Sequence, residues 1–161
     1  MKKIILSSIS LLIFTLGLGT TTYAASDMTG TEYVHRTATK SKKTSFTHTA
    51  TNTSSKTDRV SYSVSTTKST TANFSASYTL KAMVHEVGIK TEIGLGQSKT
   101  EKITITWSIP PKSKYILTAG TQFVKGSGVV KKWNAGKVVS SKSVSATWSY
   151  GSWSTKKKAK K

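Results

Sequence analysis

Residues Lys102–Gly120 read KITITWSIPPKSKYILTAG. Before the two prolines, every second position carries a large apolar side chain, at Ile103, Ile105, Trp107 and Ile109. Alternation with a period of two predicts a β-strand that has one apolar face. Because Pro110 and Pro111 donate no ladder hydrogen bonds, the strand must end at Ile109, and we expect the next one to begin near Tyr115.

The same alternation recurs on both sides of this stretch. It is found in RVSYSVS (59–65), in FSASYTLKA (74–82) and in SVSATWSY (143–150). Serine and threonine occupy the opposite faces, as expected for a sheet with one solvated face. The sequence therefore predicts an all-β fold, an elongated antiparallel sheet or sandwich of long Ser/Thr-rich alternating strands. We expect Trp107 and Trp148 to lie in its core.

Two turn-like segments divide the last third of the chain. Lys125–Gly128 reads KGSG and Asn134–Lys137 reads NAGK, and both suit hairpin turns. They predict a meander of three strands, Lys114–Val124, Val129–Trp133 and Val138–Tyr150. The chain has no cysteine, so no disulfide can support this sheet.

The first residues follow the pattern of a secretory signal peptide. Lys2 and Lys3 precede a mostly apolar stretch, and small residues then supply a cleavage site near Ala24–Ala25. We expect a signal peptide over 1–25, one all-β domain over 26–155 with looser order in 26–58, and a disordered lysine-rich tail over 156–161. The expected location is outside the cell, free or associated with a cell surface.

The net charge of +19 indicates the kind of partner. From Lys102 to Lys161 there are thirteen lysines and no acidic residue. Such a field favours an anionic cell-wall polymer or an anionic lipid surface, with nucleic acid bound only non-specifically. Aromatic residues among lysines add membrane-interface character. The predicted anionic-surface residues are Lys125, Lys131, Lys132, Trp133, Lys137, Trp153, Lys156, Lys157, Lys158, Lys160 and Lys161.

Residues Tyr78–Gly96 permit two interpretations. Leu80, Met83, Val84 and Val87 have helical spacing, and Gly88 suits a helix end. Strand alternation fits as well, and it changes parity at His85–Glu86, as a turn or bulge would require. We favour a hairpin of Phe74–Val84 and Val87–Leu95. Its apolar residues, the candidate membrane-contacting set, are Phe74, Tyr78, Leu80, Val84, Val87, Ile89, Ile93 and Leu95.

A Ser/Thr-rich strand, an amphipathic hairpin, a second alternating strand and then IPPKSKYIL (109–117) resemble the stem region of aerolysin-type β-pore-forming proteins, a group that includes epsilon toxin and the mosquitocidal toxins. The pattern is also similar to that of small secreted Ser/Thr-rich β-proteins of Gram-positive bacteria. The resemblance covers Val60–Leu117. It implies a hairpin that crosses a bilayer once several copies have closed a barrel.

Catalytic chemistry has little support in the sequence. There are six acidic residues and three histidines, and no zinc-protease, nucleophile-elbow or phosphate-loop motif is present. His85 and Glu86 are adjacent, but neighbours on a strand point to opposite faces. We therefore expect no enzymatic activity, no catalytic residue, no metal and no cofactor.

Two functions compete on this evidence. The favoured one is a secreted, basic, non-enzymatic β-protein that binds an anionic surface of the cell envelope. The alternative is a small membrane-active or pore-forming protein, toxin-like or bacteriocin-like, that forms a homo-oligomer on membranes.

Overall fold

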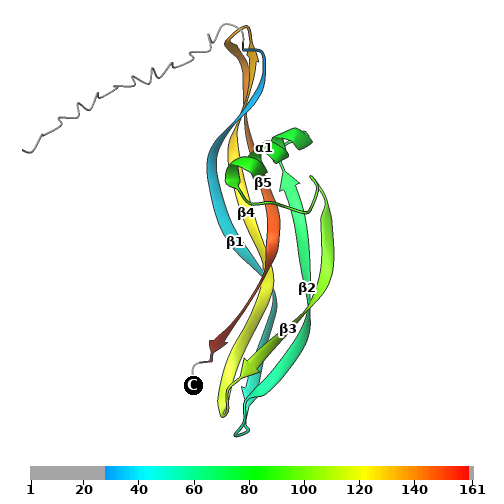
Figure 1. The fold of residues 1–161 in the computed structure, drawn as a ribbon, viewed down its shortest axis with the longest axis vertical. Coiled ribbons are helices and arrows are strands. Elements are labelled where there is room, and N and C mark those ends of the chain that lie inside the picture. Colours follow the sequence, from blue (N-terminus) through cyan, green and yellow to red (C-terminus); the bar gives the residue numbers. More distant parts are fainter. Residues whose placement is uncertain (1–27, 160–161) are drawn as a thin grey trace, which may run out of the picture.

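The computed structural model describes residues 28–159 as a long, narrow bundle of strands that run along the molecular axis (Figure 1). In chain order its elements are β1 (Gly30–Asn52), β2 (Asp58–Ala72), α1 (Ser77–Val87), β3 (Ser98–Ile109), β4 (Ser113–Asn134) and β5 (Lys137–Lys158). β1, β4 and β5 each have 22 or 23 residues, which at about 3.3 Å per residue makes each roughly 70 Å long. The predicted all-β class is confirmed.

The strands form one antiparallel sheet in the order β1-β4-β5-β2-β3. β4 is paired with β1 on one side and with β5 on the other over nearly its full length. β2 and β3 pair with each other over 12 residues. Three residue pairs, at Thr70–Ala72 and Trp148–Ala146, join β2 to β5. The sheet therefore consists of a three-stranded ribbon and a hairpin that is attached to it by a short ladder.

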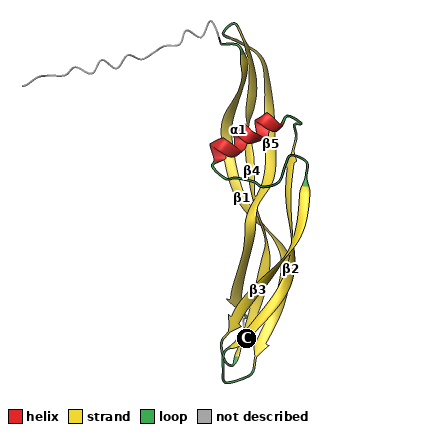
Figure 2. Ribbon diagram, turned by 45° about the vertical axis from the view of Figure 1, so that its right-hand side comes forward, coloured by secondary structure: helices red, strands yellow, loops and turns green. Residues whose placement is uncertain are grey.

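One face of the ribbon is covered by two different layers. Near the prolines, β2 and β3 lie over β1 and β4 and bury a cluster that includes Val64, Trp107 and Leu117. Farther along, α1 lies against β1 and β4, and the loop after it contacts β5. The cluster buried there includes Leu80, Met83 and Trp148 (Figure 2). Trp107 is 6% exposed and Trp148 is 0% exposed, so the prediction that both lie in the core is confirmed.

The double proline ends a strand as predicted. β3 stops at Ile109 and β4 begins at Ser113, two residues before the expected start. Lys112 takes the left-handed conformation with φ 49°. Its backbone N–H donates to Ser54 O at 3.2 Å, which ties this turn to the β1–β2 connection. We call this end of the molecule the proline end.

The predicted turn at Lys125–Gly128 is wrong, because β4 runs through it without interruption. Its two glycines provide room for side chains that cross the strand. A Cβ atom on Gly126 would lie 2.8 Å from Met83 Sδ, and one on Gly128 would lie 2.4 Å from the Tyr33 ring. The turn at Asn134–Lys137 is confirmed, with φ of 45° at Ala135 and 71° at Gly136.

Order extends farther at both ends than the sequence predicted. β1 is a continuous strand from Gly30 to Asn52, where we expected looser order, because β4 pairs with it along this length. β5 includes Lys156, Lys157 and Lys158, which were assigned to a disordered tail and are instead paired with Leu117, Ile116 and Tyr115. The predicted signal peptide (1–25), Lys160 and Lys161 lie outside the described residues.

Gly128→Ala tests whether glycine at this site serves packing. The new methyl group would meet Tyr33 and Val34 O at 2.4 Å, and the strand backbone cannot move away freely. We expect the free energy of unfolding to fall by about 1–3 kcal/mol. In the control Gly151→Ala, the nearest atom is Gln122 Oε1 at 3.5 Å, so stability should stay the same or rise by up to about 1 kcal/mol. Equal denaturation midpoints for the two variants would contradict this explanation.

Candidate functional site: the segment between β2 and β3

The connection between β2 and β3 forms a helix and a loop. The predicted hairpin of Phe74–Val84 and Val87–Leu95 is therefore wrong. α1 spans Ser77–Val87, and Gly88 ends it with φ 69° and a backbone N–H directed at Val84 O and His85 O. The helical spacing prevails because it turns Leu80 and Met83 together onto the apolar face of the ribbon, where both are buried.

Specific contacts hold this segment against the ribbon. Trp148 Nε1 donates to Ile89 O at 2.9 Å, and Thr70 Oγ1 donates to Ile93 O at 3.0 Å. At the start of the segment, Asn73 N donates to Ser145 O at 3.1 Å, and Ser145 N donates to Asn73 Oδ1 at 2.8 Å. The loop and the start of the segment are thus attached to β5 and to the end of β2, and we call residues 73–97, which lie on the sheet in this way, the stored segment.

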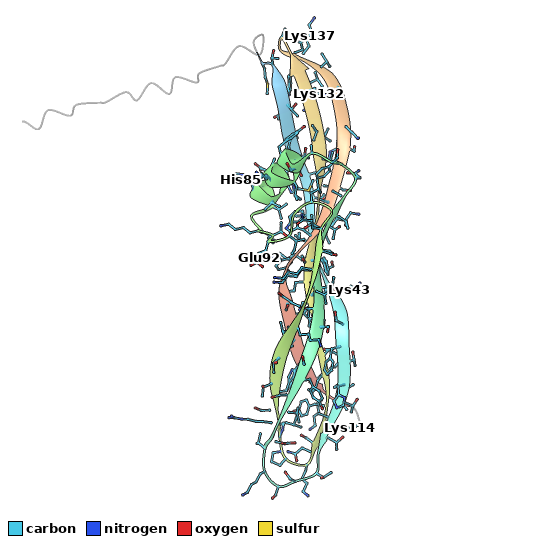
Figure 3. All side chains as sticks on the ribbon, turned by 90° about the vertical axis from the view of Figure 1, so that its right-hand side faces the viewer. Lys43, His85, Glu92, Lys114, Lys132 and Lys137 are labelled. Atoms are coloured by element: carbon cyan, nitrogen blue, oxygen red, sulfur yellow. The ribbon has the colours of Figure 1, made fainter. Side chains whose placement is uncertain are left out.

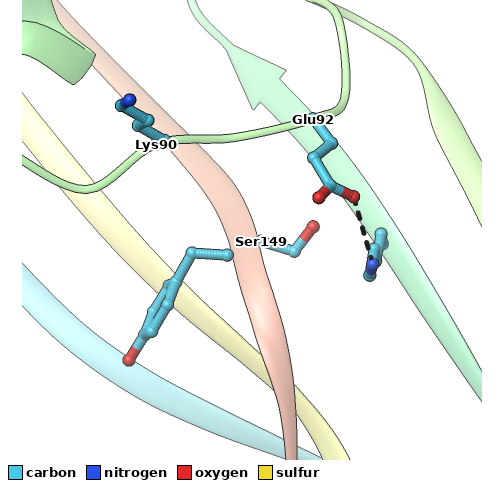
Figure 4. Close-up of a pocket in the computed structure, with 5 residues that line it drawn as sticks. Lys90, Glu92 and Ser149 are labelled. Atoms are coloured by element: carbon cyan, nitrogen blue, oxygen red, sulfur yellow. Dashed lines mark hydrogen bonds and ion pairs between the residues drawn. The ribbon is translucent and has the colours of Figure 1, made fainter.

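A small ionic cluster lies where the loop passes β2. Lys68 Nζ lies 2.8 Å from Glu101 Oε1 on β3 and 3.4 Å from Glu92 Oε2 in the loop. Figure 4 shows Glu92 reaching toward β2, beside Lys90 and Ser149, in a recess that these residues line with Lys68 and Tyr150. The hydrogen bond from Lys68 lowers the pKa of the Glu101 carboxyl, and the same bond raises the pKa of Lys68.

The register of the β2–β3 ladder can be continued into the stored segment. Val60 is paired with Trp107 and Ser69 with Ser98, and in every pair of the ladder the two residue numbers add up to the same value. Continued past the ladder, this register would place Phe74 opposite Ile93, Tyr78 opposite Ile89, and Leu80 opposite Val87. Paired residues share a face, so these apolar side chains would all join the apolar face that contains Val60 and Trp107.

The opposite face of that extension would be polar. It would carry Ser75, Ser77, Thr79 and Lys81 on one strand, and Glu92, Lys90, Gly88 and Glu86 on the other. Lys81 and Glu86 would stand directly opposite each other as an ion pair. The turn would fall at Met83–Val84. One sequence thus satisfies a helix in the structure and an amphipathic hairpin in continuous register.

The lysines predicted for anionic-surface binding do not form a single patch. Lys131, Lys132, Trp133 and Lys137 lie at the end where β4 turns into β5, and Lys156–Lys158 lie near the proline end. Lys125 and Trp153 lie between them (Figure 3). β1, β4 and β5 together carry 12 lysines and Arg36 against one acidic residue, Glu32. The whole ribbon is therefore a basic surface.

The two tryptophans predicted for this surface are partly exposed. Lys131 Nζ lies 5.8 Å from the centre of the Trp133 ring, and Lys42 Nζ lies 5.2 Å from the Trp153 ring. Trp133 Nε1 also donates to Glu32 Oε2 at 2.9 Å. The Trp–Lys pairing expected from the sequence is thus present at both residues, although they lie at different levels of the ribbon.

Among residues 28–159, no helix is long and apolar enough to cross a bilayer. The same residues contain no group of three or more metal-ligating side chains. His85 and Glu86 lie together on α1, with Nδ1 and Oε1 3.7 Å apart, and both are exposed.

Lys68 and Glu101 were not among the residues predicted to form a site. Lys68 stands between Thr66 and Thr70 on β2, and Glu101 between Lys99 and Ile103 on β3, where the face that contains Val64 and Ile103 becomes polar. Charges of opposite sign at this end of the two alternating stretches were the available signal. It could not reveal Glu92, because the helix and loop that bring this residue to Lys68 were predicted as a strand.

Comparisons with known proteins give few matches. No protein-family profile matches the sequence, and no curated protein sequence matches it. Among solved structures, the fold is similar to that of parasporin-2, a Bacillus thuringiensis toxin that recognizes cancer cells. That match has a TM-score of 0.32 and 15% sequence identity, and it covers 80% of this chain and 72% of the toxin chain.

Because of the ionic cluster of Lys68, Glu101 and Glu92, we expect the stability of the fold to decrease at acidic pH. Because the pKa of Glu101 is lowered in the folded protein, its contribution to stability is complete above the unfolded-state pKa of about 4.3. That contribution is lost as the pH falls from there through the folded-state pKa. We expect the melting temperature of the wild type to fall in this range, and that of Glu101→Gln to start lower and fall less. Glu86→Gln, which removes an exposed carboxylate on α1, should keep the wild-type profile. Parallel profiles for the wild type and Glu101→Gln would contradict the assignment.

Proposed function

We propose that this protein is exported, attaches to an anionic membrane surface through its basic ribbon, and crosses the bilayer with a β-hairpin made from β2, the stored segment and β3. The observation that supports the proposal is the shared register. The ladder observed between β2 and β3 would, if continued, place every large apolar side chain of the segment except Met83 and Val84, at the turn, on one face.

The dimensions of the extended hairpin suit a bilayer. Its apolar face would run over 72–82 on one strand and 85–95 on the other, about 11 residues each, and a transmembrane strand needs about 9–11. Lys68, Lys99 and Glu101 lie on the same face immediately beyond this band. Charged groups there would stay at the headgroup level and set the depth of insertion.

The conversion breaks few backbone bonds of the sheet. β2 is held to β5 by three residue pairs, and the helix lies against the ribbon mainly through Leu80 and Met83. The new strands would have unpaired edges in lipid, where unsatisfied backbone groups are costly. Hairpins from several copies must therefore pair side by side and close a barrel, so the active form is a homo-oligomer on the membrane.

The distribution of charge supports a ribbon that attaches to the surface and a stored segment that enters the bilayer. Residues 73–97 carry Lys81, Lys90, Glu86 and Glu92 and are neutral in sum, whereas the ribbon carries a net charge of +12. A neutral segment can leave water at lower cost than a basic one. A basic ribbon raises the local concentration of protein at an anionic surface.

A second function rests on the ribbon charge alone. The protein would bind an anionic polymer of the cell envelope and keep the stored segment in place. Binding would then be reversed by salt, because it would consist of exposed lysines near anionic groups. No vesicle leakage and no oligomer would accompany it.

The two functions are separated by a pair of substitutions at neighbouring residues of α1. Ser77 and Tyr78 both lie in its first turn, and both are exposed, Tyr78 by 54%. In the extended hairpin, Tyr78 would face lipid and Ser77 would face the barrel lumen. Because an acidic side chain on the lipid face is unfavourable, we expect Tyr78→Asp to reduce leakage of dye from anionic vesicles by about tenfold or more, and Ser77→Asp to leave it nearly unchanged.

Both substitutions place a carboxylate near the helix N-terminus, where it contributes about 0.3–1 kcal/mol of stability. Their melting temperatures should therefore equal or exceed that of the wild type, so a loss of leakage cannot be attributed to unfolding. Equal leakage from the two variants would contradict the hairpin. Salt-reversible binding without leakage of the wild type would favour the second function.

A reversible disulfide tests whether the segment must leave the ribbon. A Cβ atom on residue 126 would lie 2.9 Å from Met83 Cγ, the position that the sulfur of Met83→Cys would take, so the two sulfur atoms can come within bonding reach. We expect oxidised Met83→Cys/Gly126→Cys protein to bind anionic vesicles without leakage, and a reducing agent to restore leakage. The chain has no other cysteine, so each single-cysteine variant serves as a control and should leak in both conditions. Full leakage from the oxidised double variant would refute the release of α1.

A further inference from the structure

The end of the ribbon where β4 turns into β5 is apolar as well as basic. Large exposed hydrophobic side chains are few in the described residues, and three of them, Met28, Val138 and Val139, lie here, with exposures of 44%, 44% and 61%. Gly136 N donates to Met28 O at 3.0 Å, and Ala135 N donates to Thr29 Oγ1 at 3.2 Å, which joins the start of the described chain to the turn. We call Met28, Val138 and Val139 the apolar tip.

The apolar tip lies beyond both layers that cover the ribbon. β1, β4 and β5 continue past α1 as a bare three-stranded extension (Figure 1). Val138 is paired with Trp133, and Val139 follows it at the irregularity in the β4–β5 ladder, so the apolar groups are not confined to one face. The core cluster that contains Leu80, Met83 and Trp148 includes neither valine. This arrangement leaves both valines in water for no packing benefit within the chain.

Lysines surround the apolar tip. Lys132 and Lys137 lie at this end in Figure 3, and Lys131 and Lys142 lie just below on β4 and β5. Glu32, the acidic residue of the ribbon, accepts a hydrogen bond from the Trp133 indole at 2.9 Å. Lys137 lies in the turn beyond the valines, and Lys131, Lys132 and Lys142 lie farther back. Apolar side chains with an indole and lysines on both sides suit the interface of an anionic bilayer, where the flexible lysine stems can reach headgroups.

The tip and the proposed hairpin point to the same end. β2 runs antiparallel to β5 with Ala72 opposite Ala146. Continued along β5, that register would bring residue 81 to the level of Lys137, so the Met83–Val84 turn would reach the level of the apolar tip. A molecule docked through this tip would hold the turn of the new hairpin at the lipid surface, and the hairpin would then have to move past the ribbon to cross the bilayer.

We infer that the apolar tip is the membrane-docking site of this protein and that its partner is an anionic phospholipid bilayer, into which Val138, Val139 and Met28 insert while the adjacent lysines contact headgroups. The choice of lipid as the surface rests on the proposed function. Docking itself does not require release of α1, so it precedes insertion and can be measured apart from it.

The test measures binding of the full mature chain to sedimented vesicles of phosphatidylcholine alone and mixed with phosphatidylserine. Val138→Ser/Val139→Ser should weaken binding to the mixed vesicles by about tenfold or more, because the apolar contribution is lost. The control is Ile116→Ser. Ile116 is also an exposed apolar residue, 37% exposed and paired with Lys157, but it lies near the proline end, so its variant should bind as the wild type does.

An environment-sensitive dye identifies the inserted end without deleting the valines. Val139→Cys and Ile116→Cys, each labelled with NBD, should differ on mixed vesicles: emission shifts to the blue at 139 and stays unchanged at 116. Wild-type affinity of the double serine variant, or a dye at 139 that remains in water, would overturn the docking site. Binding of the oxidised Met83→Cys/Gly126→Cys protein that still depends on Val138 and Val139 supports it, even if the wild type causes no leakage.

Discussion

The structure depends on the burial of one face of a ribbon that is roughly 70 Å long. β4 pairs with β1 and with β5 along this length, but a three-stranded sheet needs its apolar face covered as well to be stable. Two layers share this task. The β2–β3 hairpin covers the half near the prolines, and α1 with its loop covers the next part. Each layer is held mainly by side-chain packing, since β2 has three paired residues on β5.

This arrangement explains how a segment can have two periodicities. As a helix, it needs apolar residues about every three or four positions to face the ribbon, and Leu80 and Met83 satisfy that need. As a strand, it needs them at every second position, and Phe74, Tyr78 and Leu80 satisfy that one. Tyr78 fits the strand pattern but not the helical one, because on the helix its side chain is exposed and not packed in the core. In the proposed hairpin, this large, apolar and exposed side chain would gain a buried position.

Local patterning predicted the strands that alternate cleanly, because period two is a property of a few adjacent residues. Trp107 and Trp148 were placed in the core on that basis, and Pro110–Pro111 ended β3 because proline lacks a donor. The prediction of a turn at Lys125–Gly128 was wrong for a reason that no local pattern reveals. Gly126 and Gly128 make room for Met83, Trp148 and Tyr33, which are distant in sequence. The prediction of a hairpin instead of a helix over residues 74–95 was wrong for a similar reason. The outcome depends on the apolar surface of the ribbon that α1 covers, and this surface is formed by residues distant in sequence. For the candidate site, the lysine-rich surface was predicted, but the cluster of Lys68, Glu101 and Glu92 needed the loop to be placed.

The separation of charge along the fold follows from the same division. Side chains that remain in water near an anionic surface gain from positive charge, whereas those that enter a bilayer lose by any charge. In this chain, the ribbon carries 12 of its lysines, and the stored segment has two lysines balanced by two glutamates. In the continued register, all four charges of that segment fall on the polar face, with Lys81 opposite Glu86. The apolar face of the segment therefore contains no lysine or acidic residue between Ala72 and Leu95, and this follows from the observed ladder without any adjustment of its register.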